Sequence, residues 1–306
     1  MKNLATSNPA TSSPVKGVLW MLVAGVLFVS MTAIVKVLGT RIPAPEAAFL
    51  RYVLGLVFLI PMIRPLMLAR LTRKQLALFS WRGLAHTGAV CLWFYAMARI
   101  PIADVTAMNY LSPIYVTIGA SLFLGEKMAL RRILAVVAAL IGGLIILRPG
   151  FREVGSGHLA MLIAAFFFAT SYLLAKRMVD EVGVAATVTM LSLTVTVGLA
   201  PLAMMNWVTP TAYEFALLFG LAAVATAGHF TMSMAMAAAP ITVTQPVGFL
   251  QLVWAITLGA LVFDEGVDAW VLIGSGLIIG AISFMTWREA LLKRRMRTPV
   301  APATKI

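Results

Sequence analysis

Charged residues and cysteines are both scarce in this sequence of 306 residues. Only 11% of the residues are charged, against about a quarter in an average soluble domain, and 61% are hydrophobic. The one cysteine, Cys91, lies within an apolar run, so the chain forms no internal disulfide and offers no thiolate metal site. A chain with so much apolar surface is expected to have lipid as its solvent.

Motifs for chemistry or nucleotide binding are missing as well. The glycines before Glu126 fall short of a phosphate loop, because Glu126 stands where Lys and Ser or Thr are required. We find no H-x-x-x-H pattern, cysteine cluster or Ser/His/Asp arrangement, so no catalytic residue, metal or cofactor is expected. Glu126 and Glu265 each end an apolar run, and we expect them to cap loops or to pair with nearby Lys127 or Arg131.

Long apolar runs dominate what is present. Ten of them approach the length of about 20 residues that a helix needs to cross the hydrocarbon core of a bilayer. The runs are 17–38, 45–63, 81–98, 102–124, 132–148, 157–175, 184–205, 213–237, 241–263 and 269–288. An alternative start of the third run is Gln75, with the first residues as an interfacial segment. The first run is longer than the core of a signal peptide, and no A-x-A cleavage site follows it. The sequence therefore predicts an all-α membrane protein of ten transmembrane helices.

The 24 Lys and Arg residues are divided unevenly between the two sides of these runs. With the N-terminus inside, the outer loops hold only Arg41, Arg99, Arg148 and Arg152. Two further cations fall within runs, and the other 18, including Arg82 at the start of the third run, fall on the inner side. Since Lys and Arg accumulate in cytoplasmic loops, 1–16 and 289–306 are predicted to be cytoplasmic tails of an inner-membrane protein. The net charge of +13 therefore indicates topology, and no nucleic acid partner is expected.

The sequence also repeats itself. A shift of 140 residues places 17–24 on 157–164, and a shift of 139 places Pro101-Ile102 on Pro240-Ile241. The two units, 17–148 and 157–288, therefore hold five helices each. Because five is an odd number, the second unit is predicted to be inverted relative to the first, an arrangement typical of secondary transporters.

Two stretches of the sequence, one in each half, contain short motifs. The first half contains Leu124-Gly-Glu-Lys and Gly142-Gly-Leu-Ile-Ile-Leu-Arg-Pro, between Arg82 and Pro149. The second half contains Gly228-His229, Gln251-Leu-Val-Trp254 and Phe263-Asp-Glu265. Together they resemble EamA-type members of the drug/metabolite transporter superfamily, over essentially the whole chain as two EamA repeats. His229 with the Gln-Leu-Val-Trp run is most similar to the proteobacterial branch that holds S-adenosylmethionine and riboflavin carriers.

This resemblance implies a secondary transporter of a small organic metabolite that works by alternating access. Its candidate cargoes are riboflavin, S-adenosylmethionine, and an amino acid or amino-acid-derived compound. The alternatives are a membrane-embedded enzyme or sensor on the same scaffold, and a channel. The sequence leaves open which metabolite is carried, in which direction, and whether the carrier works as a homodimer.

Polar and aromatic side chains at membrane depth are the candidates for a substrate cavity, because each polar group there costs a few kcal/mol unless it is paired or hydrated. His86 and Trp93 share one helix face and either line the cavity or pack in the core. His229 shares one helix face with Thr226 and Ser233. This polar face either lines the cavity or bonds a neighbouring helix. The predicted cavity residues are Lys36, Arg51, His86, Trp93, Asn109, Tyr172, His229, Gln245, Gln251 and Trp254.

The two cations within runs each have two interpretations. Lys36, near the outer end of the first helix, either contacts an anion at the cavity mouth or extends its ammonium to the interface. Arg51, two turns into the second helix, contacts either the substrate or backbone carbonyls. Pro113 and Pro246 each remove a backbone hydrogen bond, which produces either a kink or a break that meets substrate.

Acidic residues are absent from the middle of every run. Asp104 lies near the outer end of the fourth helix, and the other ten acids lie in loops, tails or helix ends. The deeper groups that titrate near neutral pH are His86 and His229. We therefore expect exchange or facilitated diffusion, with any proton dependence passing through a histidine.

Overall fold

The computed structural model describes residues 13–68, 70–124, 130–151, 153–239 and 241–297. These residues form helices and no extended strand, which confirms the all-α prediction. The helices are α1 (Pro14–Leu38), α2 (Ala44–Gly55), the 3-10 helix η1 (Leu56–Leu59), α3 (Ile60–Leu68), α4 (Arg73–Met97), α5 (Ile102–Asn109), α6 (Ser112–Leu124), α7 (Leu130–Leu147), α8 (Ser156–Val182), α9 (Val184–Met204), α10 (Ala212–Ala238), α11 (Ile241–Gly248), α12 (Leu250–Val262) and α13 (Ala269–Arg297).

Seven helical segments in the described part of the chain are long and apolar enough to cross a membrane, and α12 is a shorter apolar helix. These lengths establish a multi-pass membrane protein without establishing the predicted ten spans. The difference between seven and ten spans lies partly in the helices α5, α6, α11 and α12. Each of these four helices is too short to cross the membrane alone. The runs 102–124 and 241–263 are thus each divided into two helices.

The two divided runs meet at their breaks. The hydroxyl of Tyr110, just after α5, donates to the carbonyls of Gly248 at 3.4 Å and Phe249 at 3.3 Å, between α11 and α12. The rings of Tyr110 and Phe249 also pack edge to face, with centroids 5.2 Å apart. Pro113 is the second residue of α6, where a missing N–H costs little. The carbonyl oxygens at the break between α11 and α12 therefore accept hydrogen bonds from the Tyr110 hydroxyl, which lies at the break between α5 and α6.

Helix α4 starts well before the predicted run 81–98. Thr72 and Gln75 form a capping box in which Thr72 Oγ1 accepts from the Gln75 amide at 3.3 Å and Gln75 Oε1 accepts from the Thr72 amide at 3.0 Å. This cap satisfies two donors at the helix start and allows the helix to begin at Arg73. Arg82, which the cation count assigned to the cytoplasmic side, is consequently within α4 and only 4% exposed.

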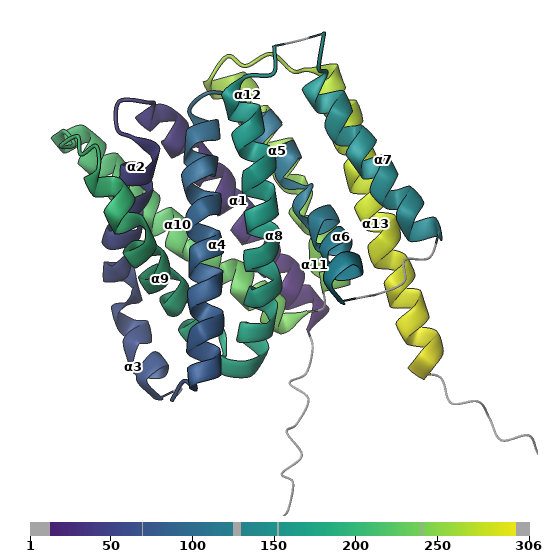
Figure 1. The fold of residues 1–306 in the computed structure, drawn as a ribbon, viewed down its shortest axis with the longest axis horizontal. Helices are drawn as coiled ribbons and strands as arrows, with labels where there is room; N and C mark the ends of the chain where they lie inside the picture. Colours follow the sequence, from purple (N-terminus) through teal and green to yellow (C-terminus); the bar gives the residue numbers. More distant parts are fainter. Residues whose placement is uncertain (1–12, 69, 125–129, 152, 240, 298–306) are drawn as a thin grey trace, which may run out of the picture.

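Helices from opposite halves of the chain pack along one another. The closest pairings are α1 with α10, α4 with α8, α7 with α13, and α2 with α9. Figure 1 shows α7 and α13 as a pair at one side of the bundle, with α4 and α8 at its centre. The α7–α13 pair approaches closely because a Cβ built on Gly142 would lie 2.6 Å from the carbonyl oxygen of Gly274.

One end of the bundle is tied together by ion pairs between the two halves. We call it the tied end and define it by three pairs: Lys36–Glu265, Arg41–Glu214 and Arg148–Asp268. It is the end that carries the α1–α2 and α12–α13 connections, at the top of Figure 1. At the opposite end, the side-chain contact between Gln75 and Glu181 is longer, at 3.4 Å, and exposed.

Candidate functional site

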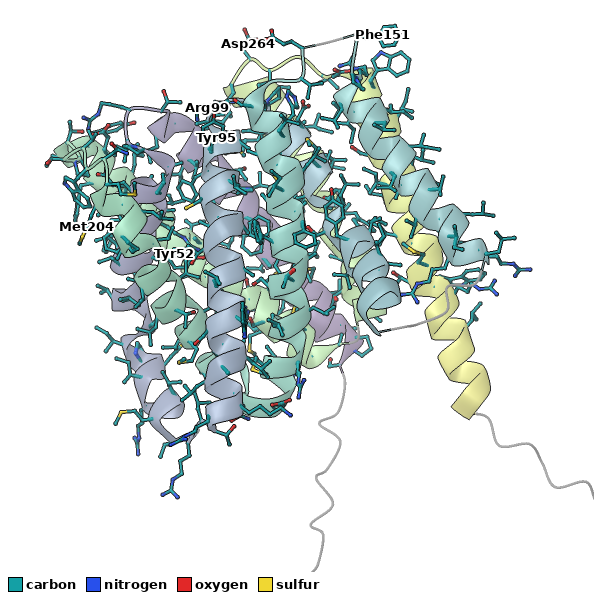
Figure 2. All side chains as sticks on the ribbon, in the orientation of Figure 1. Tyr52, Tyr95, Arg99, Phe151, Met204 and Asp264 are labelled. Carbon is teal, nitrogen blue, oxygen red and sulfur yellow. The ribbon has the colours of Figure 1, made fainter. Side chains whose placement is uncertain are left out.

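A cluster of polar side chains from four helices lies inside the bundle, part-way between its ends. We call it the central polar cluster and define it as Arg51 and Tyr52 of α2, Arg82 and His86 of α4, Ser171 and Tyr172 of α8, and His229 of α10. Figure 2 shows Tyr52 at this depth, well below Arg99 and Asp264 at the tied end. The cluster thus combines both halves of the chain, as a site between two repeats requires.

His86 is the centre of the cluster and is only 1% exposed. Its ring centroid lies 5.6 Å from that of His229 and 6.4 Å from that of Tyr52, both in edge-to-face geometry. Its Nδ1 lies 3.0 Å from the Ser171 hydroxyl, which fixes the orientation of the ring. Phe168 packs against its other side, with centroids 5.4 Å apart. The imidazole is therefore held by residues of α2, α8 and α10 together.

Two guanidinium groups border the histidines. The Arg51 Cζ lies 3.8 Å from the centroid of the Tyr52 ring, in cation–π geometry. Arg82 lies one helical turn before His86, and its Nη1 donates to the Thr187 carbonyl at 3.1 Å. Both arginine residues are only 4% exposed. Among the described residues, no carboxylate forms an ion pair with either guanidinium.

Tyr172 extends the cluster toward the broken helix of the first half. Its ring stacks on Phe168, with centroids 5.8 Å apart and planes 11° apart. Asn109, the last residue of α5, interacts with the Tyr172 side chain. Ser112 in turn donates to Asn109 Oδ1 at 3.5 Å. The contacts therefore join Arg51, His86, Asn109, Tyr172 and His229, five of the ten predicted cavity residues, into one connected region.

The other predicted residues lie elsewhere or outside the described part. Trp93 is 7% exposed and packs edge to face on Phe94. Trp254 lies against α1, where a Cβ built on Gly25 would be 2.6 Å from its ring. Gln251 is partly buried on α12. The side chain of Gln245 lies outside the described residues. The roles of these four side chains remain predictions.

Lys36 lies at the tied end and is bound to protein groups. Its Nζ lies 2.5 Å from Glu265 Oε1 and donates to the Ile100 carbonyl at 3.1 Å. The second oxygen of Glu265 accepts from the Ile102 amide at 3.0 Å, at the start of α5. Glu265 thus caps a helix of the other half and pairs with Lys36. Glu126 and Lys127 lie outside the described residues, so the predictions for them are not tested. In this structure the anion that contacts Lys36 is a protein carboxylate.

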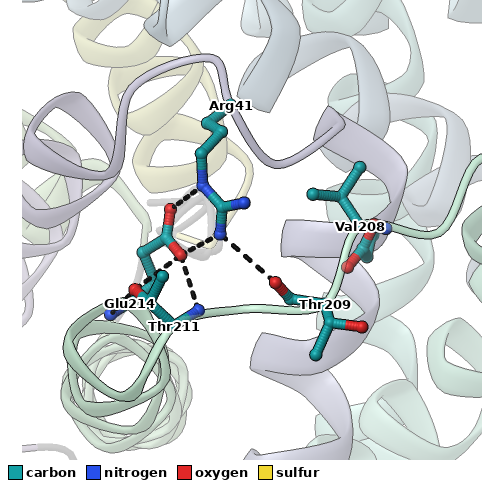
Figure 3. Close-up of polar contacts among 6 residues, drawn as sticks. Arg41, Val208, Thr209, Thr211 and Glu214 are labelled. Atoms are coloured by element: carbon teal, nitrogen blue, oxygen red, sulfur yellow. Dashed lines mark hydrogen bonds and ion pairs between the residues drawn. The ribbon is translucent and has the colours of Figure 1, made fainter.

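The second ion pair of the tied end has a wider hydrogen-bond network, shown in Figure 3. Arg41 Nε donates to Glu214 Oε1 at 2.6 Å, and Arg41 Nη2 donates to the other oxygen. The hydrogen bond to Glu214 is the main reason that the pKa of Arg41 is raised above its usual value. Glu214 also accepts from the Thr211 amide at 2.7 Å, and Glu46 accepts from the Val208 amide at 2.8 Å. The α1–α2 connection and the start of α2 are therefore fastened to the start of α10 and the loop before it.

Several features of the interior, including Ser171 beside His86, were not predicted from the sequence. Arg82 and Tyr52 belong to the central cluster, and Arg82 has a detectable signal because it stands four residues before His86 on one helix face. His158 Nε2 lies 3.3 Å from Asp104 Oδ2, and the two side chains are 6% and 2% exposed. His158 belongs to the first turn of α8, and Asp104 belongs to the first turn of α5. These positions at helix starts are the sequence signal that both residues lie near one end of the bundle.

Comparison with known proteins adds the following. The family model described as the EamA-like transporter family matches the chain twice, over residues 15–148 and 155–287. The riboflavin transporter of Vibrio cholerae is 28% identical, and the match covers 93% of this chain and 97% of that protein. The S-adenosylmethionine uptake transporter of Rickettsia prowazekii is 26% identical, with 92% and 96% covered. A solved crystal structure that is 16% identical shares the fold, with a TM-score of 0.63 over 94% of this chain and 100% of that chain.

Proposed function

Because the chain belongs to the EamA-like transporter family, we propose that it is a secondary carrier that moves a small organic metabolite across the bacterial inner membrane by alternating access. The observation that carries the proposal is the central polar cluster, which both halves of the chain build part-way between the two ends of the bundle. Riboflavin and S-adenosylmethionine are the first cargoes to test, because the relatives named above carry those names. An amino acid or amino-acid-derived compound is the third class.

The proposed architecture is two inverted units, 17–148 and 157–288, with ten spans and both tails in the cytoplasm. Helix pairing supports it. The first helix of the first unit, α1, packs on α10, and the first helix of the second unit, α8, packs on α4. Since α8 is the counterpart of α1 and α10 is the counterpart of α4, a two-fold axis between the units converts the first contact into the second. The α2–α9 and α7–α13 contacts each join a helix to its own counterpart, as the same axis requires.

The proposed transport cycle alternates between closure at the two ends of the bundle. With both tails inside, the tied end faces outward, so the described conformation is closed toward the outside. Opening there requires separation of Lys36 from Glu265 and of Arg41 from Glu214. Cargo then reaches the central polar cluster from alternate sides, and His86 and His229 are the groups through which any proton dependence passes.

Reconstituted full-length protein in proteoliposomes provides the test. We expect saturable uptake of at least one of riboflavin, S-adenosylmethionine or a labelled amino acid, with counterflow when unlabelled cargo is loaded inside. Flux that rises linearly over the same concentration range supports a channel. Chemical conversion of the cargo supports the enzyme alternative, and binding without flux supports a sensor. Protein-free vesicles are the control for leakage.

A further inference from the structure

The charge of the central polar cluster is unbalanced. It holds two guanidinium groups, which stay protonated at any physiological pH, and no acidic side chain. Arg51 lies over the Tyr52 ring, and Arg82 stands one helical turn before His86, whose ring contacts those of Tyr52 and His229. Two positive charges therefore act on one small region within the membrane-spanning part of the protein.

Among the described residues, no carboxylate forms an ion pair with a side chain of this cluster. Nine of the 11 acidic residues lie in loops or in the terminal turns of helices, Glu289 lies further inside α13, and Glu126 lies outside the described residues. Glu46 lies five residues before Arg51 and Asp104 five residues before Asn109, and each is the third residue of its helix. Glu46 is bound to the Val208 amide at 2.8 Å, and Asp104 is paired with His158. A buried cation without a counter-charge is costly, so the charge here calls for an anion from outside the chain.

Hydrogen-bonding groups in the cluster are also left over. Arg82 has five N–H donors, and the Thr187 carbonyl takes one of them. Its Nε is fully buried and has no hydrogen-bond partner among the described residues. The same is true of His86 Nε2, one helical turn away. Buried polar groups in folded proteins are nearly always bonded, so two such atoms on residues one helical turn apart indicate a place where a ligand bonds.

Aromatic rings surround these free groups. Tyr52 and Phe168 approach His86 from two helices, and Tyr172 stacks on Phe168 with parallel planes. Phe28 of α1 packs edge to face on His229, with centroids 5.4 Å apart. Rings of this kind bind the faces and edges of a planar ring, whereas a flexible aliphatic ligand gains no such directional contact.

We propose that the cargo of this carrier is a planar aromatic molecule of net negative charge, whose carboxylate or phosphate is held between Arg51 and Arg82. The proposal rests on the proposed transport function and narrows it. Guanidinium groups suit such ligands because they offer paired donors to two oxygen atoms at once. His86 Nε2 provides a further bond, and the aromatic side chains contact the ring.

The test compares cargoes that differ only in charge. Riboflavin is paired with riboflavin 5′-phosphate, and indole-3-acetamide is paired with indole-3-acetate, so that phosphate and carboxylate are tested on separate rings. S-adenosylmethionine represents a cationic cargo. For wild-type protein in proteoliposomes, we expect the acid of at least one pair to show a half-saturation concentration about tenfold or more below that of its neutral partner. The same acid stabilises the purified protein against heat at a correspondingly lower concentration.

Substitutions of the two arginines then test whether the preference for the acidic cargo depends on them. Arg51→Gln and Arg82→Gln should each reduce the preference for the acid by about tenfold, with a smaller effect on the neutral partner. The matched control is Arg99→Gln. The Arg99 guanidinium lies 3.7 Å from the Tyr95 ring centroid, which repeats the stacking of Arg51 on Tyr52, but at the exposed tied end. The Arg99 variant should keep the preference. The wild-type heat-stability comparison decides the proposal even where an arginine variant does not fold.

The possible outcomes distinguish failure of the anion proposal from failure of the proposed transport function. Saturable flux in which neutral and acidic partners are equal in both pairs, or in which S-adenosylmethionine is preferred, overturns the anion proposal and leaves the carrier intact. A preference that survives in both arginine variants also overturns it. Absence of saturable flux for every cargo of the panel counts against the proposed transport function itself.

Discussion

The ion pair between Lys36 and Glu265 provides the sharpest test of closure at the tied end. Glu265→Gln removes the negative charge but keeps an oxygen that can accept from the Ile102 amide. The Lys36 and Glu265 side chains are 23% and 13% exposed, so the pair lies between a screened surface bridge and a buried one. Fully exposed pairs contribute up to about 1 kcal/mol, and hydrogen bonds to charged groups about 1.5–3 kcal/mol. We therefore expect a loss of about 1–2 kcal/mol from the closed state.

That loss is measurable as hydrogen exchange of the first turn of α5. A change of 1–2 kcal/mol in the opening equilibrium raises exchange of the 102–109 segment by about 5- to 30-fold. Asp264→Asn is the matched control, because it makes the same chemical change at the neighbouring, exposed residue. If the two variants exchange within twofold of each other, the Lys36–Glu265 pair does not hold this end closed. Faster hydrogen exchange in Glu265→Gln that is confined to residues far from α5 would also show that the Lys36–Glu265 pair does not hold this end closed.

Three further predictions test the helix breaks, the α7–α13 contact and the topology. Tyr110→Phe removes the hydroxyl that bonds the break in the second half and should cost about 0.5–1.5 kcal/mol, seen as a lower melting temperature; Tyr115→Phe is the control. Gly142→Ala should destabilise by about 1–3 kcal/mol because its Cβ meets a backbone oxygen, whereas Gly276→Ala, with open space around it, should not. A reporter fused after Ile306 should report a cytoplasmic location, and a periplasmic signal would refute the proposed topology.

Several helices could be placed from the sequence almost to the residue. The runs 184–205 and 213–237 correspond to α9, Val184–Met204, and α10, Ala212–Ala238. Both are bounded by short polar segments, so hydropathy alone marks their ends. Hydropathy misplaced the start of α4, because its first turns carry cations and its start is set by the capping box of Thr72 and Gln75. It could not locate the breaks, since the residues around Tyr110 and Phe249 are as apolar as the helices they separate.

The site could be predicted only in part, because helical spacing gives a face and not a depth or a partner. The spacing drew attention to His86 and His229 but gave no reason to bring them together from helices that are far apart in the sequence. Arg82 was assigned to the cytoplasm because the third run was started at 81. Once α4 starts at Arg73, the spacing of four residues to His86 places the guanidinium inside the bundle.

The unpaired charges of the central cluster also bear on how the carrier cycles. Moving an empty site between the two sides of the membrane exposes Arg51 and Arg82 to each new environment without a counter-charge. An anionic cargo neutralises part of that charge and satisfies Arg82 Nε and His86 Nε2, so the loaded protein reorganises fewer unbonded polar groups during the same movement. The barrier is then lower with cargo than without it. This difference favours exchange of one acid for another over net transport, and it requires no acid at midplane and no proton relay.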